Sequence, residues 1–350
     1  MKKKNILIIF IILILGGIAV YLYMTRSNAT FSSKYNDFAI ADTGSITKIF
    51  MADKNNNTVL LTKNGIGDWT LNKTYKARIS GVNMLLETFS KLVTKYPVPK
   101  KAHNGVISRL AARSVKVEIY QMVYRVDVLG IKLFPHEKLT KTYYVGDATP
   151  DNMGTFLLME GADVPFVVQL LGLRGFIASR YSTQEKDWRD HTVFRARLND
   201  IRRIEVNIPA EPQNSYLITN ENDEVRLWKN DGSEPVTHFD TLKVLNYMTA
   251  FNDLRYEALL NDIDPHRIDS ISNSAPWFII SLIDTKGDTT VMKTFFKPND
   301  SKQFDMYGKL YTVDIDRAYA LVNDGRDFVL IQYFVFDKIL KPLSFFLPNG

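Results

Sequence analysis

The longest apolar stretch of the chain runs from Ile6 to Met24 and follows three lysines. As a helix, its roughly 19 residues would extend about 28 Å, close to the ~30 Å hydrocarbon core of a bilayer. Only Arg26 follows the stretch closely, so the positive-inside rule predicts a cytoplasmic N-terminus and an exported remainder. Five positions spread along this predicted anchor are Ile6, Phe10, Leu15, Val20 and Tyr23. The pattern predicts a single-pass membrane protein.

A cleaved secretory signal is the alternative interpretation of this stretch. Ser27-Asn28-Ala29 offers the small residues that a signal peptidase requires, with cleavage after Ala29. The apolar run is longer than the ~7 to 15 residues of a signal, however, and Tyr21 and Tyr23 stand near its outer end as interfacial anchors do. We therefore expect an uncleaved anchor over residues 1–27 and a short tether over residues 28–37.

Beyond the tether, the spacing of apolar residues changes to that of strands. Two β-branched runs, 46–50 and 58–62, flank an asparagine-rich turn and predict a hairpin. A helix is predicted between Ser80 and Pro97, because its apolar residues recur with helical spacing. These residues are Val82, Leu85, Leu86, Phe89, Leu92 and Val93. Further strands are predicted over 115–120, 142–145, 155–159 and 166–170.

The same succession of elements recurs in the second half of the chain. Trp228 follows Trp69, and a second apolar helix face around Val244 and Met248 follows the first, both about 160 positions later. The pattern predicts two tandem α+β repeats, 38–197 and 198–350, with a seam near 194–199. In each repeat, a helix with one apolar face should cover one side of a largely antiparallel sheet.

Composition excludes several classes of protein. Hydrophobic residues make up 45% of the chain and charged residues 23%, which is enough apolar surface for packed cores and argues against disorder. The absence of cysteine excludes disulfides and thiolate chemistry. The net charge of +6 includes the three lysines before the anchor, so the exported part is nearly neutral and nucleic acid is not an expected partner.

Several segments within residues 38–205 resemble the family named domain of unknown function 4340. They are Ile46-Thr47-Lys48-Ile49, Trp69, Pro97-Val98-Pro99, Lys141-Thr142-Tyr143-Tyr144-Val145-Gly146, Arg180-Tyr181-Ser182-Thr183, Asp187-Trp188-Arg189-Asp190 and Ile201-Arg202-Arg203-Ile204. The resemblance implies a bacterial envelope protein with an N-terminal anchor in the inner membrane and tandem periplasmic α+β repeats. It implies an association with gliding-motility-type ABC transporter components, and it supplies no activity and no catalytic or ligand residues.

Two short clusters could carry chemistry. Asp187-Trp188-Arg189-Asp190-His191 contains an acid, a base and a cation, but adjacent side chains diverge, so a structural role is favoured. Asp262-Ile263-Asp264-Pro265-His266 could face a cation, and a turn initiated by aspartate before proline is favoured over a metal site. We expect no catalytic residue, no metal and no small-molecule cofactor.

Binding surfaces are the remaining expectation. Residues 91–116 carry several cations and no acid, and Leu343 to Leu347 is predicted to be an exposed apolar tail. The candidate partner surface comprises Lys91, Lys95, Lys100, Lys101, Arg109, Arg113, Phe345 and Phe346. The leading hypothesis is a non-enzymatic accessory protein that binds the bilayer and a protein partner in an envelope or transporter complex. The alternative is a binding or hydrolytic protein that acts on an envelope polymer through a cleft between the repeats.

Overall fold

The computed structural model describes residues 10–18, 37–128, 131–221, 224–229, 232 and 234–348. Its folded part divides into two compact units, which meet between Trp188 and Arg189. Within the described residues, no helix combines the length and the apolar character that crossing a membrane requires. Most of the predicted anchor, with Ile6, Val20 and Tyr23, lies outside the described residues, whereas Phe10 and Leu15 belong to a described helical stretch.

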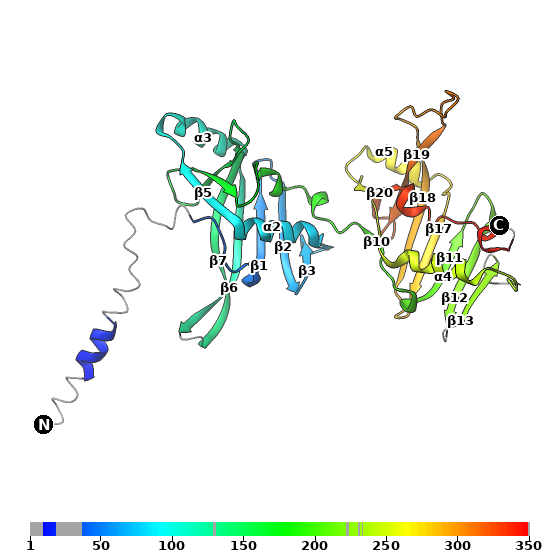
Figure 1. Ribbon diagram of the computed structural model, residues 1–350, viewed down its shortest axis with the longest axis horizontal. Helices are drawn as coiled ribbons and strands as arrows, with labels where there is room; N and C mark the ends of the chain where they lie inside the picture. The colour runs from blue at the N-terminus through cyan, green and yellow to red at the C-terminus, as the bar shows by residue number, and fades with distance from the viewer. Residues whose placement is uncertain are drawn as a thin grey trace. The chain divides into compact units, whose positions relative to one another are not determined.

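The first unit is built on one antiparallel sheet of nine strands (Figure 1). In chain order its elements are β1 (Ile46–Ala52), β2 (Thr58–Gly65), β3 (Asp68–Leu71), β4 (Tyr75–Lys76), α2 (Ile79–Lys91), β5 (Leu92–Pro97), α3 (Lys100–Arg113), β6 (Val115–Val128), β7 (Ile131–Ala148), β8 (Thr155–Met159) and β9 (Phe166–Leu170). Across the sheet the order is β4-β3-β2-β1-β6-β7-β8-β9-β5.

The second unit contains a second nine-stranded sheet. Its elements are β11 (Ile201–Asn207), β12 (Tyr216–Glu221), β13 (Glu224–Lys229), β14 (Glu234–Pro235), α4 (Thr241–Thr249), β16 (Ala258–Leu259), α5 (Pro265–Ser272), β17 (Ile279–Asp284), β18 (Thr289–Pro298), β19 (Val313–Val322), β20 (Asp327–Gln332) and α6 (Tyr333–Phe336). The strand order is β14-β13-β12-β11-β17-β18-β19-β20-β16, which matches the first sheet position by position. A small sheet pairs β10 (Thr192–Phe194) with β15 (Leu254–Arg255). The molecule is therefore α+β, with two repeat-like halves.

One face of each sheet carries the main core. Along β1, the buried side chains of Ile46, Ile49 and Met51 are separated by partly exposed ones, as expected for a strand with one covered face. Helix α2 packs Val82 and Phe89 into this core. Contrary to the predicted helix, α2 ends at Lys91, because the residues after it pair with β9 as strand β5.

The segment that follows the last strand completes each core. In the first unit the backbone N–H of Arg78, the residue before α2, donates to the carbonyl of Trp188 at 2.7 Å. In the second unit the N–H of Asp240, the residue before α4, donates to the carbonyl of Phe346 at 2.8 Å. Both Trp188 and Phe346 are buried. The two segments thus close equivalent positions of the two units.

This closure corrects the expectation of an exposed apolar tail. Phe346 is fully buried and contacts the rings of Tyr216 and Tyr247, each at 5.2 Å between centroids. Leu343 is also buried in the same core. Phe346 therefore cannot belong to an accessible partner surface, because its contacts are needed inside the second unit.

The opposite face of each sheet is covered only at one end. Helix α3 packs Val106 and Leu110 against Phe156 and Val167. Helix α5 lies against Phe295, Tyr319 and Phe328 in the same way. Strands β8 and β20 are accordingly buried on both faces, whereas β1 and β11 are covered on one.

Truncation of the chain after Pro342 should destabilise the second unit. The deletion removes Leu343 and Phe346 from the core, and loss of a buried phenylalanine alone costs about 3 to 5 kcal/mol. Chemical denaturation of the full-length protein and of the truncated variant measures the difference. A variant that ends at Leu347 is the control and should unfold as the full-length protein does. Equal stability of all three would contradict the closing role of Phe346.

Candidate functional site

The second unit carries a groove between α4, α6 and the segment that follows α6. Its volume is about 430 Å³. The residues that line it are Lys243, Asn246, Tyr247, Ala250, Phe334, Asp337, Lys338, Lys341 and Phe345. We call it the aromatic–lysine groove.

Phe334 is the aromatic side chain that this groove exposes. It is 96% exposed, whereas Phe336, two residues later in α6, is fully buried. Since successive positions of a helix point in different directions, the burial of Phe336 turns Phe334 towards solvent. A large apolar side chain left in water gains nothing for folding, and together with Phe345 it adds apolar area to the groove.

Phe345 lies at the other side of the groove, half-buried between two lysines. The Lys243 ammonium donates to the Phe345 carbonyl at 3.0 Å and lies 5.1 Å from the ring centroid. Lys341 lies 5.5 Å from the same ring and donates to the Asp337 carboxylate at 2.7 Å. The lining of the groove contains three lysines and one aspartate, so the groove is cationic around its aromatic side chains.

The cations predicted from the sequence as part of the partner surface all lie in the first unit. Lys91 ends α2 and pairs with Glu87 at 2.6 Å, and Lys95 lies on β5. Lys100, Lys101, Arg109 and Arg113 lie on α3 and are exposed. Phe345 belongs to the second unit, so the structure brings it together with Lys243 and Lys341 instead.

Sequence reasoning missed Phe334. Residues 328–336 form an apolar run that is too short to span a membrane as a helix, and its pattern alone predicts one buried strand. The strand ends at Gln332 and a short helix follows. The sequence offers no periodic signal for this groove, because α6 spans only Tyr333–Phe336 and both Lys338 and Lys341 lie after its end.

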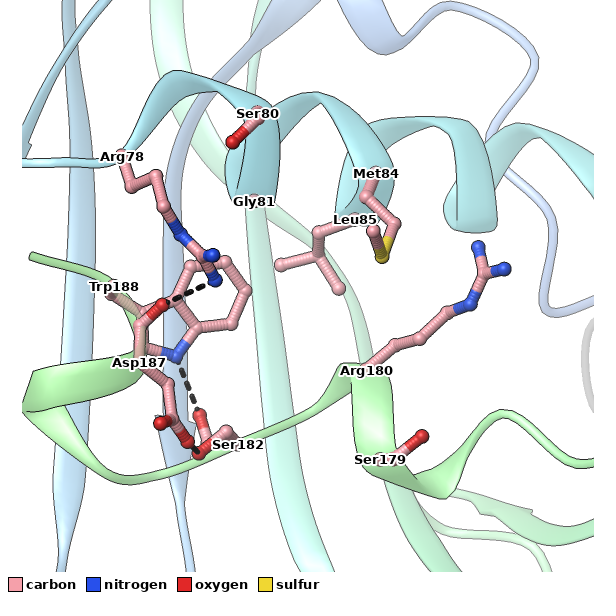
Figure 2. A pocket seen from close by; sticks show the side chains of 10 residues that line it. All are labelled: Arg78, Ser80, Gly81, Met84, Leu85, Ser179, Arg180, Ser182, Asp187 and Trp188. Atoms are coloured by element: carbon pink, nitrogen blue, oxygen red, sulfur yellow. Dashed lines mark hydrogen bonds between the residues drawn. The ribbon is translucent and has the colours of Figure 1, made fainter. Parts of the chain in front are cut away.

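A smaller cavity in the first unit lies where α2 begins. Its volume is about 210 Å³, and Figure 2 shows the ten side chains that line it. Arg78 reaches from the start of α2 and donates from Nη2 to the carbonyl of Asp187 at 2.7 Å. Trp188 forms the wall beneath it and donates from its indole to the carbonyl of Ser182 at 2.8 Å.

Two guanidinium groups give this cavity its charge. Met84 and Leu85 lie between Arg78 and Arg180 (Figure 2). Arg180 donates to the Thr88 hydroxyl at 2.9 Å. The Asp187 carboxylate accepts from the Ser182 hydroxyl at 2.5 Å. Nε of Arg78 is buried without a hydrogen-bond acceptor, and the charge of Arg180 also acts on the nearby Glu87 carboxylate. The arrangement suits a small anionic group.

The 187–191 cluster is divided between different structural roles. Trp188 is a core residue of the first unit, and Arg189 forms a buried ion pair with Asp327 in the second. Asp190 accepts from the Thr192 hydroxyl at 2.9 Å, and His191 stacks on Tyr256 with 4.5 Å between ring centroids. Burial raises the pKa of Tyr256 to about 12, so its phenol stays neutral at ordinary pH. These side chains do not converge on one substrate.

The 262–266 cluster is a helix start. The Asp264 carboxylate accepts from the backbone N–H of His266 at 3.0 Å and caps α5, and Pro265 occupies the first turn. Among all the residues that the structure describes, no group of three or more His, Asp or Glu side chains has the geometry of a metal site.

The fold and the site define a protein of two repeat-like α+β units with a cationic, aromatic surface groove. A family model described as Domain of unknown function (DUF4340) matches residues 69–270, and the chain belongs to this family. Neither the curated proteins nor the solved structures give a match to the chain.

Replacing Asp327 with alanine should strongly destabilise the second unit. Both members of the Arg189–Asp327 pair are almost fully buried, and removing one partner leaves an uncompensated charge, which costs about 3 to 5 kcal/mol. Asp253→Ala is the matched control, because Asp253 pairs with Arg255 on the surface at 2.9 Å and should contribute less than about 1 kcal/mol. Denaturant unfolding of the two variants measures the contrast, and equal midpoints would contradict it.

Proposed function

We propose that this protein is a non-enzymatic, membrane-tethered accessory protein of the bacterial envelope. Its N-terminus is cytoplasmic, its apolar run 6–24 anchors it in the inner membrane, and its two units work in the periplasm. It binds a protein partner in an envelope or ABC-transporter-associated complex. The observation that carries this proposal is the aromatic–lysine groove, with its exposed Phe334.

The chemistry of the groove favours a protein partner with an acidic surface. An exposed aromatic ring supplies a large contact area, and aromatic residues are enriched among those that dominate binding energy. The three lysines around Phe334 and Phe345 attract acidic side chains and form the polar rim that such interfaces have. A groove of this composition supplies affinity and orientation without a nucleophile or an acid–base pair.

Binding of an anionic envelope polymer is the second candidate function. The specific observation in its favour is the cavity of Arg78 and Arg180, which holds two guanidinium groups beside serine hydroxyls. Its volume of about 210 Å³ suits one phosphate or carboxylate group of a longer molecule. The arrangement supports binding, and hydrolysis would require groups beyond those that line the cavity.

A photo-crosslinking residue at position 334 tests the leading proposal in cells. It should capture one discrete inner-membrane protein, and Phe334→Ala should weaken the affinity for that protein about 10- to 30-fold without changing stability. Tyr307 is the matched control, because it is an aromatic residue of the same unit with 88% exposure. Equal capture from positions 334 and 307 would count against the groove as the partner surface.

Inorganic phosphate tests the second candidate. It should raise the unfolding midpoint of the first unit above that in chloride of equal ionic strength, because a ligand of the folded state stabilises it. Arg180→Gln should abolish this increase, whereas the exposed Arg174→Gln, in the same segment, should retain it. If phosphate protects both variants equally, the cavity is not the anion site.

A further inference from the structure

The hairpin of β6 and β7 extends well beyond the sheet that contains it (Figure 1). Strand β1 pairs with β6 only as far as Gln121, and β8 pairs with β7 only from Tyr143 onward. Between these limits and the turn, β6 and β7 pair only with each other, down to Val128 and Ile131. The equivalent strands of the second unit, β17 and β18, are 6 and 10 residues long, compared with 14 and 18 here.

One face of the projecting hairpin is apolar and exposed. Met122, Tyr124 and Val126 alternate along β6 and therefore share a face. The register places Leu133 opposite Val126. Exposed apolar side chains of this face are Met122, Tyr124, Val126, Ile131, Leu133 and Leu139. Such a face on an isolated hairpin gains nothing for the core of its own unit.

The opposite face of the hairpin carries the cations. Arg125, Lys132 and Lys138 alternate with the apolar residues and lie on that other face, as do the exposed Asp127 and Phe134. The Lys132 ammonium still reaches to 5.4 Å from the ring centroid of Tyr124. The carboxylate of Glu137 is already paired with Lys48. Tyrosine, exposed aliphatic residues and lysine together are the composition of segments that enter the headgroup region of a bilayer.

The path of the chain brings this hairpin within reach of a tethering membrane. Asp37, where the described residues resume after the apolar run, lies beside β7. The Lys141 ammonium is 3.0 Å from its carboxylate and 2.7 Å from its carbonyl. The residues between the apolar run and Asp37 span at most about 40 Å when extended. From Lys141 to the hairpin turn, β7 covers roughly 34 Å. Anchor and hairpin can therefore meet the same bilayer.

We propose that the apolar face of the β6–β7 hairpin inserts into the headgroup region of the bilayer that holds the anchor. The inference rests on the proposed membrane tether. The proposal also gives the orientation of the first unit on the bilayer. Helix α3 packs on β7 near Gly146, at the far end from the hairpin turn. The cations of α3 therefore face away from this bilayer.

Depth-dependent fluorescence quenching tests the proposal in the full-length protein. The chain has no cysteine, so Val126→Cys and Ala112→Cys can each be labelled singly with an environment-sensitive fluorophore. The proteins are reconstituted in vesicles of phosphatidylcholine and phosphatidylglycerol that contain a nitroxide-labelled lipid. We expect at least about twofold stronger quenching at position 126 than at position 112, because only the hairpin enters the interface.

A second substitution separates insertion from mere proximity. Leu133→Glu in the Val126→Cys background should reduce the quenching at position 126 to that at position 112, whereas Ser108→Glu on α3 should leave it unchanged. Stronger quenching at position 112 than at position 126 would mean that the basic helix faces the bilayer, and it would overturn the proposal. Equal quenching at the two positions, in protein that floats with the vesicles, would also overturn it. Protein that fails to float would overturn the tether itself.

Discussion

The fold depends on covering one face of a nine-stranded sheet. Nine strands span roughly 40 Å, whereas a helix of 13 residues is about 20 Å long and about 10 Å wide. Helix α2 or α4 alone therefore leaves part of the apolar face in water. The segment after the last strand covers the remainder, and its hydrogen bond to the residue before the helix fixes it in place in both units. For this reason the chain of each unit continues past the last strand of its sheet and forms this closing segment.

The strands, the apolar helix faces and the repeat could be predicted because their patterns are local. The β-branched content of 46–50 and 58–62 and the helical spacing of Val82, Leu85 and Phe89 need no knowledge of distant residues. The closing segment could not be predicted in this way. Phe345 and Phe346 are adjacent in a tail without periodicity, and only the distant Tyr216, Asp240 and Tyr247 decide that Phe346 is buried. The end of α2 at Lys91 likewise depends on pairing with β9.

The sequence predicted the kinds of side chain in the candidate groove better than the particular residues that form it. Aromatic side chains with a cationic rim were expected, and Phe345 belongs to such a surface. The lysines beside it come from α4 and the segment after α6, not from the basic stretch around α3. Charge density along a sequence identifies cations that are exposed. It does not identify which aromatic side chain they approach, because that depends on the tertiary fold.

The shared topology of the two units indicates where function should be sought. Features that both repeats possess, such as strand order, the covering helix and the closing segment, are accounted for by the stability of an α+β sheet. Features that only one repeat possesses have no such explanation: the long β6–β7 hairpin, helix α6 with Phe334, and Arg78 at the position where α4 has the capping Asp240. All three place apolar or cationic groups at the surface. Since folding does not require these departures, the proposed binding surfaces are assigned to them.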